Sequence, residues 1–139
     1  MRVFLDSSVL LAASGSDRGA SREVFRRAPE NGWSLLTTPY VLEEVLANLP
    51  DLRASATADW AKLRPDLVLM DDVLTLDRAA VFEPATDRPI LFGALAWAEV
   101  LLTLDRGDFG VMIGGTFYGL SLLTPGDVPR KGESGGSHA

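Results

Sequence analysis

Short apolar runs separated by longer helical patterns are the feature that most constrains how this chain can fold. The first run, Arg2–Leu5, is rich in β-branched and aromatic side chains and stops at an acid, Asp6. Strands of this kind that alternate with helices are typical of an α/β sandwich with a parallel sheet. The strands that the pattern predicts are Arg2–Leu5, Trp33–Leu36, Leu67–Met70, Val100–Thr103 and Tyr118–Leu123.

Helical signals fill most of the intervals between these strands. Thr38 and Pro39 open one helix as a capping residue and a first-turn proline, and Pro50 ends it. The segment Pro29–Gly32 is expected to stop the preceding helix. The other predicted helices are Ser7–Ala13, Ala20–Ala28, Ala54–Leu63 and Ile90–Ala98, while Leu74–Val81 is ambiguous and Glu83–Pro89 reads as a loop.

Acidic residues mark the ends of the predicted strands. Asp6 follows the first strand, Asp105 follows the fourth, and Asp87 precedes an apolar helix. The carboxyl ends of parallel strands meet at one edge of a sheet, where ligands bind at a switch in strand order. Glu44 lies in the second turn of its helix near that edge, although Glu43 beside it leaves the choice of position open. Converging carboxylates repel unless a hard divalent cation such as Mg²⁺ compensates them.

Each acid also has a purely structural interpretation. Asp6 and Asp87 could cap the helices that follow them. Asp105 and Asp108 have the spacing of a capping box, with an acid at the cap and another three residues on. The pair Asp71–Asp72 reads as a solvated turn after the third strand. The metal site and the caps therefore remain alternatives at this point.

Composition removes several classes of chemistry. The 139-residue chain fits one domain, and its 47% hydrophobic content supports a sizeable core. It contains no cysteine, and its one histidine is His138 near the carboxyl end, which argues against disulfides, thiolate sites and histidine catalysis. A net charge of −6 disfavours sequence-independent adhesion to nucleic acid but is compatible with a nuclease whose metal ligands are acidic.

Four stretches together resemble the successive motifs of PIN-domain nucleases, in the right order over nearly the whole chain. They are similar in particular to those of the toxin (VapC-like) components of toxin–antitoxin pairs. The stretches are "VFLDSSVLLAA", "TPYVLEEVLANL", "DRPILFGALAWAEVLLTLDRGDFG" and "GLSLLTPGDV". The segment between the third strand and Asp87 is short for that family.

The resemblance implies a PIN-like three-layer sandwich with a five-stranded parallel sheet, in which the first and fourth strands are adjacent. It also implies hydrolysis of RNA phosphodiester bonds with Mg²⁺ or Mn²⁺. Carried over position by position, it makes Asp6, Glu44, Asp87 and Asp105 the catalytic residues. Asp6, Asp87 and Asp105 would bind the metal, with Glu44 and Asp108 as further candidate ligands.

Domain boundaries and partners follow from the same reasoning. We expect a nuclease domain over residues 1–125 and a polar, Gly/Ser-rich, disordered tail over 126–139. No apolar run approaches the roughly 20 residues of a membrane span, so a cytoplasmic protein is expected. The resemblance implies an RNA substrate, a cognate antitoxin and a homodimer.

Other functions fit the sequence less well. "RPDLVLMDDVL" resembles the phosphoacceptor strand of a receiver domain ending at Asp71, but a receiver needs a lysine after its last strand and the only lysines are Lys62 and Lys131, and Asp6 lacks a second acid beside it. A nucleotide binder is disfavoured because the chain has neither G-x-x-x-x-G-K nor G-x-G-x-x-G after a strand. A catalytically idle PIN-like binding module remains the main alternative.

Overall fold

A six-stranded sheet forms the centre of the molecule in the computed structural model, which describes residues 1–73, 88–110 and 112–128. The strands are β1 Arg2–Leu5, β2 Ser34–Thr37, β3 Leu67–Leu69, β4 Val100–Leu102, β5 Thr116–Phe117 and β6 Leu120–Leu123. Their order is β3-β2-β1-β4-β6-β5. Neighbouring strands from β3 to β6 run parallel, and β5 pairs antiparallel with β6.

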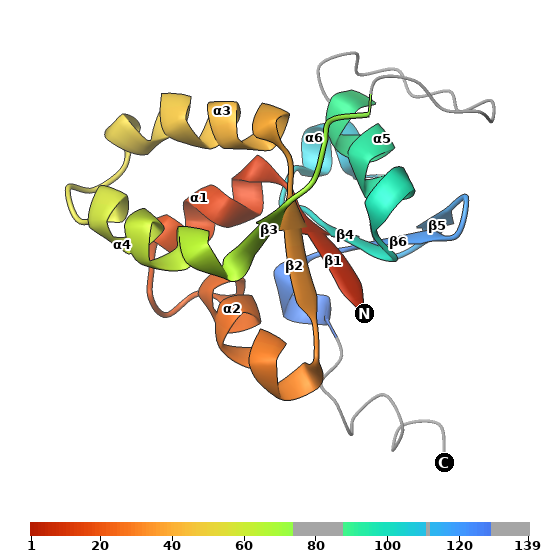
Figure 1. Ribbon diagram of the computed structural model, residues 1–139, viewed down its shortest axis with the longest axis horizontal. Helices are drawn as coiled ribbons and strands as arrows, with labels where there is room; N and C mark the ends of the chain where they lie inside the picture. Colours follow the sequence, from red (N-terminus) through yellow and green to blue (C-terminus); the bar gives the residue numbers. More distant parts are fainter. Residues whose placement is uncertain (74–87, 111, 129–139) are drawn as a thin grey trace.

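Helices cover both faces of the sheet (Figure 1). They are α1 Ser7–Gly15, α2 Ala20–Asn31, α3 Pro39–Asn48, α4 Ala56–Leu63, α5 Arg88–Trp97 and α6 Arg106–Phe109, with short 3₁₀ turns η1 Leu49–Asp51, η2 Arg64–Asp66 and η4 Pro125–Asp127. Helices α1, α2 and α4 gather on one side, α5 and α6 lie on the other, and α3 contacts both α1 and α5. Among the described helices, none is long and apolar enough to cross a membrane.

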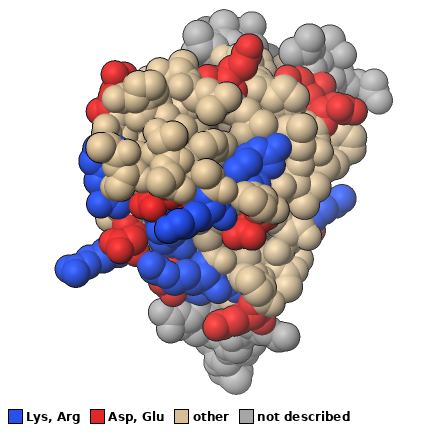
Figure 2. Space-filling model, turned by 60° about the vertical axis from the view of Figure 1, so that its left-hand side comes forward, with Lys and Arg blue, Asp and Glu red and all other residues tan. Residues whose placement is uncertain are grey.

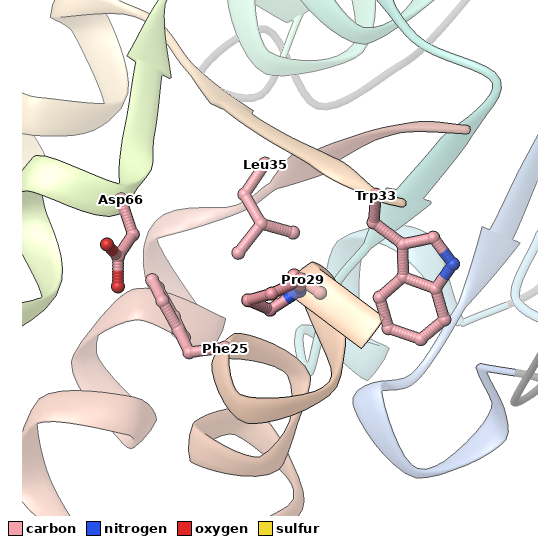
Figure 3. Close-up of a pocket in the computed structure, with 6 residues that line it drawn as sticks. Phe25, Pro29, Trp33, Leu35 and Asp66 are labelled. Atoms are coloured by element: carbon pink, nitrogen blue, oxygen red, sulfur yellow. The ribbon is translucent and has the colours of Figure 1, made fainter. Parts of the chain in front are cut away.

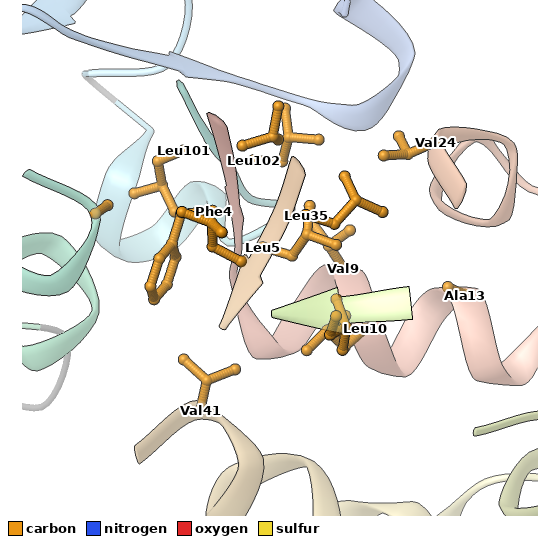
Figure 4. Close-up of a cluster of buried hydrophobic side chains, with 14 of the residues drawn as sticks. Phe4, Leu5, Val9, Leu10, Ala13, Val24, Leu35, Val41, Leu101 and Leu102 are labelled. Carbon is orange, nitrogen blue, oxygen red and sulfur yellow. The ribbon is translucent and has the colours of Figure 1, made fainter. Parts of the chain in front are cut away.

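The core lies on both sides of β1 (Figure 4). Val3, Phe4 and Leu5 are consecutive and completely buried, as expected for a central parallel strand that is covered on both faces. Helix α5 approaches this strand closely because Gly93 has no side chain. A Cβ at that position would lie 3.4 Å from the ring of Phe4 and 3.4 Å from Cγ2 of Thr38.

The predicted fold class is confirmed, with five parallel strands and the first and fourth adjacent. The short antiparallel strand β5 was not predicted. The predicted strand at Tyr118 begins instead at Leu120, because Tyr118 and Gly119 have φ values of 50° and 82° and form the turn between β5 and β6. Two central residues with positive φ are the signature of a tight hairpin turn.

Helix α2 is longer than predicted. It continues through Pro29 to Asn31 and ends at Gly32, which adopts the left-handed conformation with φ 68°. The backbone N–H groups of Gly32 and Trp33 both donate to the carbonyl of Ala28. The helix therefore ends within the segment Pro29–Gly32, as predicted, but three residues after the predicted last helical residue, Ala28, because Gly32 and not Pro29 terminates it.

Parts of several predictions lie outside the described residues. These are the ambiguous segment Leu74–Val81, the greater part of the loop Glu83–Pro89, and the tail beyond Val128. Val128 itself is 3% exposed, and its carbonyl accepts a hydrogen bond of 3.2 Å from Nη2 of Arg27. The proposed boundary at residue 125 stays a prediction.

Candidate metal centre

Asp6 is buried at the carboxyl end of β1. Asp6 is only 3% exposed. Its backbone N–H donates to the carbonyl of Leu102 at 3.1 Å, which continues the β1–β4 pairing. Asp6 also stands at the N-cap position of α1, but its carboxylate makes no capping hydrogen bond to that helix within the described structure. Capping by the side chain therefore does not account for a buried acid here.

Three hydroxyl groups surround the Asp6 carboxylate. Thr103 Oγ1 donates to Oδ2 at 2.7 Å and Ser8 Oγ donates to Oδ2 at 3.0 Å, while Ser7 Oγ reaches Oδ1 at a longer 3.3 Å. Burial raises the pKa of Asp6 above its ordinary value, and the hydrogen bonds from Thr103, Ser8 and Ser7 oppose that rise. The carboxylate is thus desolvated and held by neutral donors.

Glu44, in the second turn of α3, faces Asp6 across Ser7. Ser7 Oγ lies 3.4 Å from Glu44 Oε2, so a single hydroxyl group contacts both acids. Glu44 Oε1 is buried and has no hydrogen-bond partner among the described residues. The pKa of Glu44 is raised, first by burial and then by the negative charges of Asp6 and Asp105. Glu43 is exposed, so Glu44 is the member of this pair that faces the acids.

Asp105 stands directly before α6 and is half-buried. Its backbone N–H donates to Thr103 Oγ1 at 3.0 Å, which is the same hydroxyl that binds Asp6. Its charge acts on Glu44, which places it within electrostatic range of that carboxylate. Its position before α6 also fits the capping interpretation. Asp87 and the side chain of Asp108 lie outside the described residues.

The three described acids therefore come from β1, α3 and the turn between β4 and α6. Neither Asp6 nor Glu44 forms a salt bridge with any described Lys or Arg. No group of three or more Asp, Glu or His side chains in the described ranges has the geometry of a complete metal site. The donor set still fits Mg²⁺ or Mn²⁺, because these ions prefer carboxylate oxygens. Glu44 Oε1 is a buried acceptor without a hydrogen-bond partner among the described residues.

Asp71 and Asp72 differ from each other in role. Asp71 is exposed and follows β3, the edge strand, away from the strand ends that carry Asp6 and Asp105. Asp72 is half-buried, and its carboxylate accepts a hydrogen bond from the backbone N–H of Tyr40 at 3.2 Å. Asp72 therefore caps α3, a function that the sequence suggested for Thr38. The interpretation of Asp72 as part of a solvated turn was wrong, because its partner lies 32 residues earlier.

Arginine side chains on α2 form hydrogen bonds and ion pairs within the protein. Arg22 donates to Asp59 at 3.1 Å and to the carbonyl of Ala13 at 2.7 Å, and Arg26 pairs with Glu23 at 3.2 Å. The face shown in Figure 2 accordingly has Lys and Arg side chains interspersed with Asp and Glu. This mixed surface has no excess of positive charge that would by itself predict a nucleic-acid groove.

A small pocket lies at the opposite ends of the strands (Figure 3). It encloses about 150 Å³ and is lined by Phe25, Ala28, Pro29, Trp33, Leu35 and Asp66, of which only Asp66 is charged. Trp33 and Leu35 stand at the start of β2 and Asp66 precedes β3, whereas the acids follow their strands or lie on α3. None of the predicted site residues lines this pocket, so it is separate from the acids.

We expect Asp6 and Glu44 to make the metal-free protein less stable as pH rises. The folded-state pKa values of Asp6 and Glu44 lie above their ordinary values of 3.8 and 4.5. Their contribution to stability is therefore fully present below those ordinary values and is lost as pH rises through the raised values. In thermal denaturation in EDTA, the melting temperature of Asp6→Asn should exceed that of the wild type by an amount that increases from about pH 4 to about pH 8. A gap that stays constant over this range would contradict the burial of an ionised Asp6.

Comparisons with known proteins support the fold. No protein-family model matches the sequence, and no curated protein matches it. A solved structure described as VapBC2 from Rickettsia felis bound to a DNA fragment from their promoter matches with a TM-score of 0.62 and 14% sequence identity. The match covers 88% of this chain and 97% of that one. At this level of identity the similarity establishes a shared PIN-like fold.

Proposed function

We propose that this chain, which has the PIN-like fold, is a metal-dependent ribonuclease that uses Mg²⁺ or Mn²⁺. The observation that carries the proposal is the meeting of Asp6 and Glu44 around one serine hydroxyl. Both carboxyl groups have a raised pKa, and neither has a cationic partner among the described residues. A divalent cation would remove the repulsion that the fold imposes on them.

The residues have distinct proposed roles. Asp6 and Asp105, at the ends of adjacent strands, would hold the cation, and Asp87 would join them by the sequence resemblance. When bound, a cation would supply a water of lowered pKa and neutralise charge on the phosphate. Glu44 Oε1, which is buried and unpartnered in the described structure, would accept a hydrogen bond from that water. No covalent nucleophile is required, in agreement with a chain that has no cysteine.

The structural similarity suggests an analogy for the biological role of this chain. The matched protein is described as VapBC2 bound to promoter DNA. By analogy we propose that this chain is the toxin of a toxin–antitoxin pair, that it binds a cognate antitoxin, and that it acts as a cytoplasmic homodimer. A monomer mass by light scattering at high protein concentration would refute the homodimer.

Purified protein is expected to cleave RNA in the presence of Mn²⁺ or Mg²⁺. EDTA should stop the cleavage, and excess Mn²⁺ should restore it, because the acids need a cation to act on phosphate. Gel analysis of labelled RNA checks this result. Cleavage at the same rate in EDTA would contradict the proposal. Intact RNA together with a melting temperature that rises with Mn²⁺ would identify the idle binding module instead.

A further inference from the structure

The two oxygens of the Asp6 carboxylate have different surroundings. Oδ2 accepts two hydrogen bonds, at 2.7 Å from Thr103 and at 3.0 Å from Ser8. Oδ1 has one hydroxyl contact, a long one at 3.3 Å from Ser7, whose hydroxyl is also 3.4 Å from Glu44. A hydroxyl carries one proton, so Ser7 can donate to only one of these two carboxylates at a time. Oδ1 is therefore held less tightly by hydroxyl groups than Oδ2, and it shares its hydroxyl with Glu44.

The hydroxyls that hold Oδ2 also hold the turn that carries Asp105. Thr103 Oγ1 accepts a hydrogen bond from the backbone N–H of Asp105 at 3.0 Å, and Ser8 Oγ accepts one from the N–H of Leu104 at 3.0 Å. Each hydroxyl thus donates to Asp6 and accepts from the backbone just after β4. Thr103 is fully buried, so its hydrogen bond to Asp6 does not compete with water.

We propose that Thr103 and Ser8 are positioning residues that fix Asp6 relative to Asp105 and present only the Oδ1 atom of Asp6 to a cation. The inference rests on the proposed function, since it concerns how the acids of that site are held. A carboxylate whose Oδ2 is held by two hydroxyl bridges cannot rotate independently of the Leu104–Asp105 turn. The geometry for cation binding is then set before the cation arrives, and less ordering is needed on binding.

The test compares valine with serine at position 103 and uses a matched valine substitution elsewhere. Thr103→Val removes the bridging hydroxyl, Thr103→Ser keeps it, and Ser8→Ala removes the second bridge. Thr37→Val is the control, because Thr37 is also fully buried at a strand end but its hydroxyl has no partner in the described residues. Calorimetric titration with Mn²⁺ measures affinity, and thermal denaturation confirms that each variant is folded.

The proposal predicts a loss of Mn²⁺ affinity of about tenfold to a hundredfold in Thr103→Val, which is the usual effect of removing a partner that orients a ligand. Thr103→Ser should bind within about threefold of the wild type, and Thr37→Val should bind unchanged. Ser8→Ala should show a smaller loss than Thr103→Val, because its hydrogen bond to Oδ2 is longer.

A second readout needs neither metal nor activity. In metal-free protein, the amide hydrogen of Asp105 should exchange faster in Thr103→Val and that of Leu104 should exchange faster in Ser8→Ala, whereas both should be unchanged in Thr37→Val. Wild-type Mn²⁺ affinity in a folded Thr103→Val protein would overturn the inference while leaving the proposed function intact. A wild-type protein that binds no Mn²⁺ would overturn both.

Discussion

Asp6→Asn is expected to abolish metal-dependent RNA cleavage. The substitution keeps the size of the side chain and an oxygen acceptor for Thr103, but it removes the charge that would hold the cation. We expect the rate to fall by about a thousandfold or more, since a metal-bound carboxylate supports several kcal/mol of charge stabilisation and each 1.4 kcal/mol is a factor of ten. Initial rates of cleavage of a labelled RNA measure this effect.

The metal-free Asp6→Asn protein should also melt at a higher temperature than the wild type at neutral pH. The reason is that a buried, desolvated carboxylate has been replaced by a neutral amide. Asp71→Asn is the matched control, because Asp71 also follows a strand but is exposed. It should change neither rate nor melting temperature. Full activity in Asp6→Asn would remove Asp6 from the site, and loss of activity in Asp71→Asn would add Asp71 to it.

Glu44→Gln should lower the rate of RNA cleavage, whereas Glu43→Gln should leave it unchanged, although the two residues are adjacent. Glu44 is half-buried beside Asp6, whereas Glu43 is exposed. We expect Glu44→Gln to lower the cleavage rate by about a hundredfold, which is the lower range for removing a group that assists proton transfer. Glu43→Gln should retain the wild-type rate. Steady-state kinetics at saturating Mn²⁺ would compare the two variants.

Stability provides an independent check on the same pair. In EDTA at about pH 8, Glu44→Gln should be more stable than the wild type, because a partly buried carboxylate is replaced by a neutral amide and its repulsion with Asp6 is removed. Glu43→Gln should melt within about 1 °C of the wild type, as is usual for a surface substitution. Equal rates for the two variants would show that the orientation of Glu44 has no bearing on catalysis.

Hydrophobic patterning was sufficient to predict most of the sheet, and the reasons are local. Val3, Phe4 and Leu5 form a wholly apolar strand, and the acid that follows marks its end. The hairpin at Tyr118 was not predictable in this way, because a bulky residue with positive φ is rare and the pairing of β5 with β6 decides it. The segment Pro29–Gly32 correctly marked the end of α2, but the pattern did not show that the helix continues through Pro29 to Asn31.

The arrangement of side chains at the site was less accessible from the sequence. Clustering of acids at strand ends follows from topology, so Asp6 and Asp105 could be proposed together. The bridging hydroxyls of Ser8 and Thr103 were not predicted, although each is only two residues from one of these acids. Asp72 capping α3 depends on contact between distant segments, and no local pattern contains that information.

Because β1 pairs with β4, the site cannot assemble until the ribosome has synthesised β4 and the residues that follow it. Asp6 is synthesised before its closest hydrogen-bond partner, Thr103, which lies 97 residues later. At about 5–20 residues per second, a ribosome needs on the order of 5–20 s between the two. A nascent chain that has not yet produced β4 has neither Thr103 nor Asp105, so prematurely terminated fragments cannot assemble the acids. Cleavage activity would therefore be delayed until synthesis has passed this point.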